Sequence, residues 1–271
     1  MIGRPPHEIW ERSLKDGELR LARSTHVLAA TSLLGGFHIM LGLLALVVTT
    51  GALAAVLPET TAHVLGSLTF GIAFVFLTIG RSELFTENFL IPVSTLLVGR
   101  GSLRSLARLW GVALVFNLAG IALFGGLLAT AGVIEPEATE AAGELANTLA
   151  DRTVLAAFLS AVLAGAVITV FTWLSEAAES DLTRLFVALL IGFLLLAPST
   201  NHSVVGFGEI LFGIFAETTD ATWTDLVRNL AIAIAGNVVG GVGFVTTSRL
   251  VQAREAMAPL EDGNAEREEA G

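Results

Sequence analysis

The sequence contains no cysteine and no tyrosine among its 271 residues. Without cysteine, neither a disulfide framework nor a thiolate metal site can form. Without tyrosine, no phenol can act as an acid, and the sequence also lacks the HExxH pattern of zinc hydrolases and the GxxxxGK[ST] loop of nucleotide-driven pumps. The sequence therefore predicts neither an enzyme nor a bound cofactor or metal.

Charged residues are scarce as well, at 15% of the chain against 54% hydrophobic residues, and the mean hydropathy is +0.75. Soluble domains carry about 25% charged residues, so the composition predicts an integral membrane protein. The net charge of −10 arises mainly in loops and in the C-terminal tail. It argues against a nucleic-acid partner, which needs a basic surface. No polar linker divides the chain, so we expect one domain.

Long uncharged runs give the positions of the predicted membrane spans, because about 20 helical residues cross the hydrocarbon. Four runs are long enough to cross unaided: 27–57, 109–133, 153–175 and 230–248. Residues 60–99 form an apolar stretch with charges at its centre, which reads as one discontinuous span or as a full span followed by a re-entrant half. The apolar segments 185–197 and 204–216 are each too short to cross alone. We predict six spans, the second and fifth broken.

The flanking segments set the predicted topology. Residues 1–26 mix apolar and basic residues in a pattern that suits an amphipathic helix at the membrane surface or a solvated basic flank. The tail at 251–271 is acidic and predicted to be disordered. With an internal N-terminus, twelve of the 15 Lys and Arg residues fall on the inner side and two on the outer side. This bias predicts a multi-pass protein of the cytoplasmic membrane, residues 27–250 spanning it, with both termini cytoplasmic.

The two breaks are the segments GRSELFTEN at 80–88 and PSTNHS at 198–203. Irregular backbone at membrane depth is tolerated only where it is buried in protein or lines a water-filled cavity. Each break lies in the middle of a group of three spans, which is the pattern of an inverted repeat with its site near the midplane. Two breaks that face each other would form a pore or a binding site.

The second break carries His202, next to Asn201 and Ser203. An ionisable residue at membrane depth is expensive and is a functional candidate. Burial disfavours the imidazolium, so we expect a mostly neutral ring that can still pass a proton to a weak acid. The first break offers the backbone of Leu84 and Phe85 and the hydroxyl of Thr86, which can hydrogen-bond an anion or water in a pore.

Three charged residues flank the first break, and we expect Arg81 to pair with Glu83 or Glu87. On the broken spans, Phe70, Phe74 and Leu195 are candidates for apolar constrictions, although aromatic residues at helical spacing more often serve packing. Asn117 and Asn237 occupy matching places in the third and sixth spans, where each could satisfy backbone groups freed by a break.

These motifs resemble the formate/nitrite transporter family over about residues 20–250. ELFTEN at 83–88 is similar to the family's loop in the second span, NHS at 201–203 to its central histidine segment, and GNVVGG at 236–241 to its glycine-rich sixth span. The resemblance implies an aquaporin-like fold of six helices per protomer and a homopentamer in the lipid bilayer. Each protomer would pass small monovalent anions or their conjugate acids through its own pore.

The resemblance also implies roles for individual residues. Leu84, Phe85 and Thr86 would form the loop in the pore and His202 the proton donor, while Phe70, Leu84 and Leu195 would form the narrow points. The chain departs from the family where a fourth-span asparagine and a vestibule lysine are expected, because Gly165 and Leu149 stand there. Arg152 is the nearest cation that could replace the lysine, and Asn201 stands where formate channels often have an acid.

We therefore predict a channel or proton-linked transporter for formate, nitrite or a similar anion, with His202 protonating the passing anion. Two alternatives remain open. The missing lysine and asparagine are compatible with a pore for water, ammonia or a small polyol. The basic N-terminal segment and acidic tail are compatible with a non-conducting sensor or scaffold. An aquaporin proper is disfavoured because the paired NPA motifs are absent.

Overall fold

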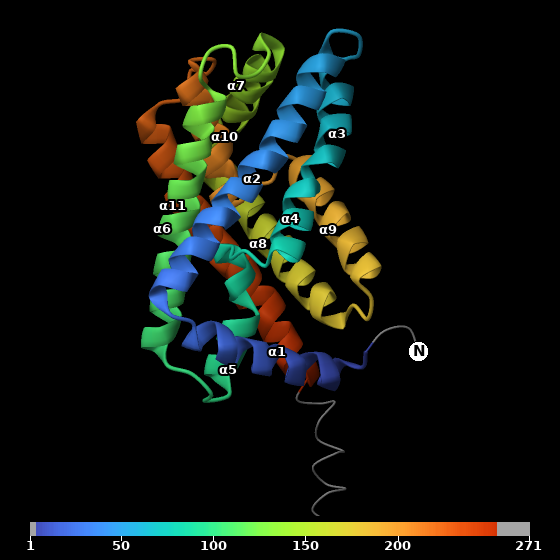
Figure 1. Cartoon of the computed structure of the whole chain (residues 1–271), viewed down its shortest axis with the longest axis vertical. Helices are drawn as coiled ribbons and strands as arrows, with labels where there is room; N and C mark the ends of the chain where they lie inside the picture. Colours follow the sequence, from blue (N-terminus) through green and yellow to red (C-terminus); the bar gives the residue numbers. More distant parts are fainter. Residues whose placement is uncertain (1–3, 254–271) are drawn as a thin grey trace, which may run out of the picture.

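The structure is a computed structural model that describes residues 4–253, and within that range it contains helices and no strands. The helices form an elongated bundle, with α1 across one end and α7 at the other (Figure 1). The predicted tail lies outside the described residues from position 254 onward. In order along the chain the helices are α1 Pro6–Ala22, α2 Thr25–Ala54, α3 Glu59–Phe70, α4 Ile72–Gly80, η1 Phe85–Phe89, α5 Ile91–Leu97, α6 Leu103–Leu128, α7 Pro136–Ala150, α8 Val154–Ala177, α9 Asp181–Leu196, α10 Ser203–Ala216, α11 Trp223–Val238 and η2 Val239–Thr246.

Within the described range, five helical segments are long and apolar enough to cross a membrane: Thr25–Ala54, Glu59–Gly80, Leu103–Leu128, Val154–Ala177 and Trp223–Ala253. The chain is thus a multi-pass membrane protein. The second segment joins α3 and α4 and has 22 residues. By contrast, α9 has 16 residues and α10 has 14, so neither reaches the usual spanning length by itself.

The segment between α6 and α8, which follows the predicted span 109–133 and precedes the predicted span 153–175, contains the helix α7. Its alanine and leucine residues recur at helical spacing and are buried, including Ala138, Ala142 and Leu149. Pro136 stands in the first turn, where its missing N–H costs nothing. The helix packs against α10 and α2 at the end of the bundle that we call the α7 side.

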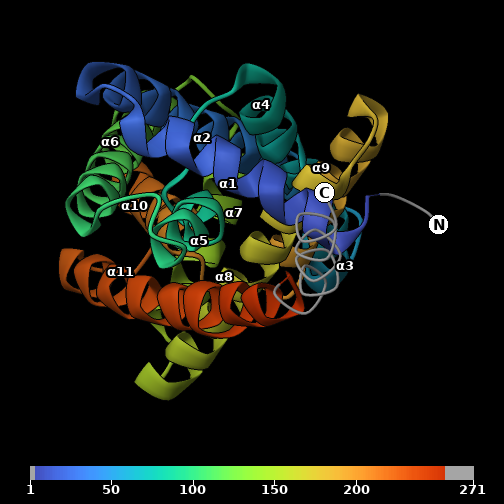
Figure 2. The same ribbon diagram turned by 90° about the horizontal axis from the view of Figure 1, so that it is seen from below.

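The opposite end, the α1 side, is covered by α1, which lies next to α5 in the view along the bundle (Figure 2). The apolar face of α1 packs on protein. Ile9, Trp10 and Leu14 form a buried cluster with Ile91 and Trp173. This helix therefore packs between α5 and the end of α8. Its charged residues Arg12, Asp16 and Arg20 face a cavity on the α1 side.

Candidate functional site

The first break begins at Arg81, whose backbone is left-handed with φ 49°. The chain then runs irregularly to Leu84 before η1 forms. Asn117 on α6 secures this segment, since its Oδ1 accepts from the Phe85 N–H at 2.9 Å and its Nδ2 donates to the Glu83 carbonyl at 2.9 Å. The side chain replaces the helical partners that these backbone groups have lost.

The second break is built in the same way. Ser199 is left-handed with φ 50°, and Asn237 on α11 accepts from the Ser203 N–H at 2.8 Å and donates to the Asn201 carbonyl at 3.1 Å. The prediction that the two asparagines satisfy freed backbone groups is confirmed. In each break the carbonyl and the N–H that bond the asparagine belong to residues two positions apart, Glu83 and Phe85 in the first and Asn201 and Ser203 in the second. The residue between them is Leu84 in the first break, and its structural counterpart in the second is His202.

The two breaks meet at a direct hydrogen bond between His202 and Thr86. His202 Nε2 lies 2.8 Å from Thr86 Oγ1, and both side chains are buried. His202 is also the N-cap of α10, where its Nδ1 accepts from the Val205 N–H at 3.1 Å. Since Nδ1 must offer a lone pair to that amide, a neutral ring carries its proton on Nε2 and donates it to Thr86. The Thr86 hydroxyl hydrogen is then free to bond another acceptor.

The predicted apolar constriction residues lie in the core. Phe70, Leu84 and Leu195, the three predicted narrow points, are fully buried and belong to the central core of the protein. Phe70 packs edge-on to Phe74, with ring centroids 6.0 Å apart. Phe85 packs away from the centre, against Phe89 and Trp110, while its N–H is held by Asn117. The structure therefore places the three predicted narrow points in one buried core cluster, which also contains Phe85, the chain neighbour of Thr86.

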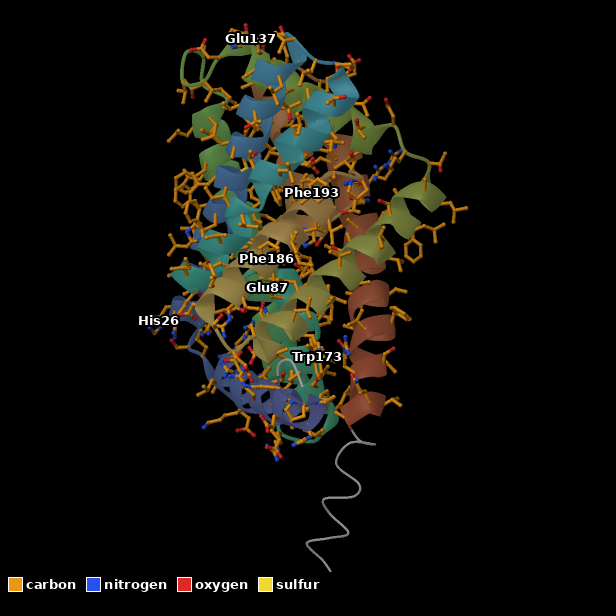
Figure 3. The ribbon with its side chains drawn as sticks, turned by 90° about the vertical axis from the view of Figure 1, so that its right-hand side faces the viewer. His26, Glu87, Glu137, Trp173, Phe186 and Phe193 are labelled. Carbon is orange, nitrogen blue, oxygen red and sulfur yellow. The ribbon has the colours of Figure 1, made fainter. Side chains whose placement is uncertain are left out.

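A cavity of about 600 Å³ opens beside the first break on the α1 side. Its lining is strongly charged, with five arginines and five acidic residues: Arg12, Arg20, Arg23, Arg81, Arg184, Asp16, Glu83, Glu87, Glu176 and Asp181. Glu87 lies between the α1 end, marked by Trp173, and the opposite end, marked by Glu137 (Figure 3). The cavity is thus a polar approach to the buried centre.

The predicted pairing of Arg81 with Glu83 or Glu87 is wrong for the described residues. Glu83 instead forms ion pairs with Arg23 and with Arg20, the latter at 3.4 Å, and accepts from Asn88 Nδ2 at 2.7 Å. Arg81 ends α4 in the left-handed conformation, which leaves its side chain exposed in the cavity. Burial works to lower the pKa of Arg20, but the nearby carboxylates outweigh it, so the pKa is raised and the charge retained.

Asn201, predicted to face the pore, bonds neighbouring helices through its side chain. Its Nδ2 donates to Asn229 Oδ1 at 2.9 Å and to the Ala157 carbonyl at 3.2 Å, so the side chain ties the break to α8 and α11. Arg152 lies on the α7 side, where it donates to the Ser199 carbonyl at 2.5 Å and to Ser160 Oγ at 3.0 Å. Burial lowers the pKa of Arg152 and the charge of Glu209 opposes this effect.

The comparison with known families decides the identity. The model of the formate/nitrite transporter family matches residues 7–251. The chain belongs to this family. A formate/nitrite transporter is a membrane transport protein and not an enzyme. Among the described residues, no group of three or more His, Asp or Glu side chains is placed to hold a metal ion.

Curated relatives agree with the family and match most of their own length. The inner membrane protein YfdC of Escherichia coli is 28% identical over 253 residues, which is 92% of this chain and 79% of that protein. A probable formate transporter of Methanothermobacter thermautotrophicus is 29% identical over 236 residues, covering 81% and 85%. The formate channel BtFdhC of Bacillus thuringiensis is 26% identical over 254 residues, covering 89% and 92%.

Solved structures share the fold of this formate/nitrite transporter. A structure described as an FNT family ion channel superposes with a TM-score of 0.79 at 18% identity, covering 89% of this chain and 96% of that one. A pentameric formate channel with formate bound superposes with a TM-score of 0.70 at 20% identity, covering 84% and 96%.

Gly165 and Leu149, where this formate/nitrite transporter departs from the family pattern, both have a local structural explanation. Gly165 lies where α8 crosses α11, and a Cβ there would overlap the Asn237 backbone carbonyl. Leu149 is 2% exposed and packs over Gly206 on α10. Close packing therefore replaces polar groups at these two positions.

We expect Gly165→Ala to destabilise the protein by about 1–3 kcal/mol, because an added methyl forces α8 and α11 apart. The measurement is the free energy of unfolding in detergent. Gly111→Ala on α6 is the matched control, since a Cβ there meets no atom within 4 Å. If both variants unfolded alike, the close approach at Gly165 would not be a packing constraint.

Two features of the site were missed by the sequence reasoning. Arg20 and Arg23 bind Glu83 from 63 and 60 positions away in the chain, and no local sequence pattern predicts that pairing. Glu209 is a buried carboxyl in α10, with 3% exposure. In that case the signal was present, because Glu209 is an acidic residue inside the apolar segment 204–216.

Proposed function

We propose that this protein forms a pore for small monovalent anions such as formate or nitrite, with His202 and Thr86 at its centre. The observation that carries the proposal is their 2.8 Å hydrogen bond at the point where two helix breaks meet inside an apolar core. A hydrogen-bonded polar pair at that depth adds less to packing than apolar side chains of the same size would. Its use is to hydrogen-bond a solute that has left its water behind. The names of the relatives direct the choice toward formate-like anions.

The proposed topology is six crossings in an inverted repeat. In the first half, α3 and α4 descend to the break and η1 with α5 continues beyond it; in the second half, α9 and α10 do the same in the opposite direction. Matching asparagine bonds and matching left-handed residues in the two breaks support this repeat. The α1 side is cytoplasmic by the distribution of basic residues, which puts both termini there.

The proposed assembly is a homopentamer with one pore per protomer. Large apolar side chains remain exposed on the outer faces of the spanning helices, including Leu123, Leu155 and Leu159. Such apolar faces contact either lipid or a neighbouring protomer. The pentameric formate channel that shares this fold supports the second kind of contact for part of this surface.

The proposed passage assists the anion where water is excluded. Carrying a bare charge through hydrocarbon is costly, so an anion passes more easily as its conjugate acid. Thr86 donates its free hydroxyl hydrogen to the anion while the His202 Nε2–H polarises that hydroxyl. Complete proton transfer requires the imidazolium. Nδ1 releases the Val205 amide and takes up a proton from solution, and Nε2 then passes its own proton through Thr86 to the anion. The apolar residues on either side exclude competing water.

Transport tests the proposal directly. Uptake of labelled formate into proteoliposomes should exceed that of empty liposomes, and should be greater at about pH 5 than at about pH 7.5, where fewer protons are available. Nitrite and a neutral polyol are measured alongside. Uptake of the polyol without either anion would replace this proposal with a neutral-solute pore, which the absence of the expected lysine at Leu149 and of the expected asparagine at Gly165 would then explain.

Thr86→Val is expected to lower formate uptake about tenfold, because valine keeps the shape and removes the hydrogen-bonding hydroxyl. Thr86→Ser keeps the hydroxyl and should stay within about twofold of the original protein. Both variants are compared by initial uptake rates at equal amounts of reconstituted protein. Equal rates for valine and serine would show that the hydroxyl takes no part in passage.

A further inference from the structure

Glu209 is a carboxyl inside the membrane part of the protein that the proposed passage does not use. Its side chain is 3% exposed, and its Oε2 is buried without a hydrogen-bond partner among the described residues. An ionisable group at this depth is costly and requires a reason. Structural pairing does not supply one here, in contrast to Glu83, which is held by two arginines and an asparagine.

Glu209 lies on the same face of α10 as His202. Seven residues separate them, which is close to two helical turns, and the rise is about 10 Å. Val205, one turn from His202 on that face, is 1% exposed. Glu209 is therefore placed beyond the central histidine in the direction of the α7 side.

The inverted repeat gives an independent position for Glu209. Gly99 and Glu217 are both left-handed, with φ 77° and 57°, and they end α5 and α10 with the same spacing that relates Phe85 to Ser203. By this spacing Ile91 is the counterpart of Glu209. Ile91 lines the cavity on the α1 side. In the repeat, Glu209 thus holds on the α7 side the position that Ile91 holds beside the α1-side cavity, and it carries a carboxyl there.

The charges of the two halves are distributed differently. Asn117 bonds the Ser32 carbonyl on α2, and Asn237 bonds the Ala161 carbonyl on α8, so Ser32 and Ala161 are counterparts. The sequence offset from Ser32 to Ala161 makes Leu149 the counterpart of Arg20 and Arg152 that of Arg23. On the α1 side Arg20 and Arg23 hold Glu83, whereas the counterpart of Glu83 is the neutral Asn201. The second break therefore has no carboxylate at the position that corresponds to Glu83.

Arg152 is the cation nearest the second break on the α7 side, where the Ser199 carbonyl and Ser160 Oγ hold it, and the charge of Glu209 opposes the effect of burial on its pKa. The other elements packed against α10 place their charges elsewhere. The α7 glutamates are exposed, and Asp225 and Arg228 of α11 pair with each other. His38 of α2 bonds Ser82, Arg104 and Arg108 of α6 lie at its α1 end, and Glu87 of η1 lines the cavity on the α1 side. Among these charged groups, Arg152 is therefore the one that influences the charge state of Glu209.

We propose that Glu209 is a proton-binding residue on the α7-side approach to His202, and that it must be protonated for a small monovalent anion to pass. This proposal rests on the proposed function. An ionised Glu209 repels an incoming anion and neutralises Arg152. A proton taken from the solution on the α7 side removes the repulsion and leaves the charge of Arg152 available to the anion. The proton returns to the same solution when Glu209 ionises again.

Glu209→Gln tests the proposal through the ratio of its formate uptake to that of the original protein across pH. The ratio cancels the protonation of formate itself, which both proteins experience equally. We expect a ratio near one at about pH 5 and roughly tenfold at about pH 8, where the carboxylate repels the anion and the amide does not. Glu144→Gln, the same change on the exposed face of α7, should give a ratio near one throughout.

Glu209→Asp keeps the carboxyl and should keep a falling pH profile, which guards against a variant that is merely misfolded. A Glu209→Gln ratio that is the same at every pH would overturn the proposal. Infrared difference spectra provide a readout without transport, since a titrating carboxyl gives a C=O band that Glu209→Gln removes. Absence of such a band would also overturn the proposal. A band in a protein that carries no anion would uphold proton binding at Glu209 and refute the proposed function.

Discussion

Replacing His202 by alanine is expected to lower formate uptake at about pH 5 by roughly a hundredfold or more, the range typical of a lost acid–base group. Two effects combine. The anion loses the polarised Thr86 hydroxyl and, with the ring, the proton that the proposed passage draws on. The measurement is the initial rate of labelled formate uptake into proteoliposomes, with empty liposomes subtracted.

His202→Asn separates this role from the structural one. Asparagine is a good N-cap, so it can hold the Val205 amide at the start of α10 while removing the imidazole. Uptake should be lost in both variants, with the stability of α10 better preserved in the asparagine variant. His26→Ala, at an exposed residue near the start of α2, is the control for removing a histidine. Full uptake by the asparagine variant would contradict a role for the ring.

Asn117→Leu and Asn237→Leu are each expected to destabilise the protein by about 2–6 kcal/mol. Each substitution leaves one backbone N–H and at least one carbonyl of a break without its partner, at a cost of about 1–3 kcal/mol per group, and membrane depth places them beyond the reach of bulk water. Leucine is close to asparagine in size, so packing changes little. Unfolding of the purified protein in detergent measures the effect.

Asn147→Leu provides the comparison for the asparagine variants. Asn147 accepts from Thr219 at 2.5 Å and from the Asp220 N–H at 3.1 Å at the solvent-facing end of α7, where water can replace both bonds. Its loss should cost about 1 kcal/mol. If Asn117→Leu were no more damaging than this surface change, the first break would be held by something other than the asparagine.

The positions of both breaks were predictable because charge, proline and small polar residues interrupt apolar runs that are otherwise uniform. The roles of Asn117 and Asn237 followed from the same reasoning, since freed backbone groups at membrane depth require a polar partner. The place of His202 beside Thr86 could be expected only by combining two segments 116 positions apart. Their roles in transport remain predictions.

Other features depend on distances that a sequence does not contain. The pairing of Glu83 with Arg23 arises because α1 folds back over the bundle, and Arg81, the nearer cation in the chain, is turned away by its left-handed backbone. Asn201 was expected in the pore because it adjoins His202, yet neighbouring residues in an extended segment point in different directions, and it bonds Asn229. Glu209 was overlooked for a different reason, since one acid changes the hydropathy of its segment very little.

The hydrogen bond from the Val205 amide to His202 Nδ1 has an energetic consequence for the cell. A histidine relays protons across itself by accepting one at one nitrogen and releasing another from the second. Here the helix holds one nitrogen, so that relay stops while the cap is intact. In the proposed passage, acid equivalents then cross only together with a solute that opens the cap. A membrane carrying many copies of this protein would keep its proton-motive force whenever the solute is scarce.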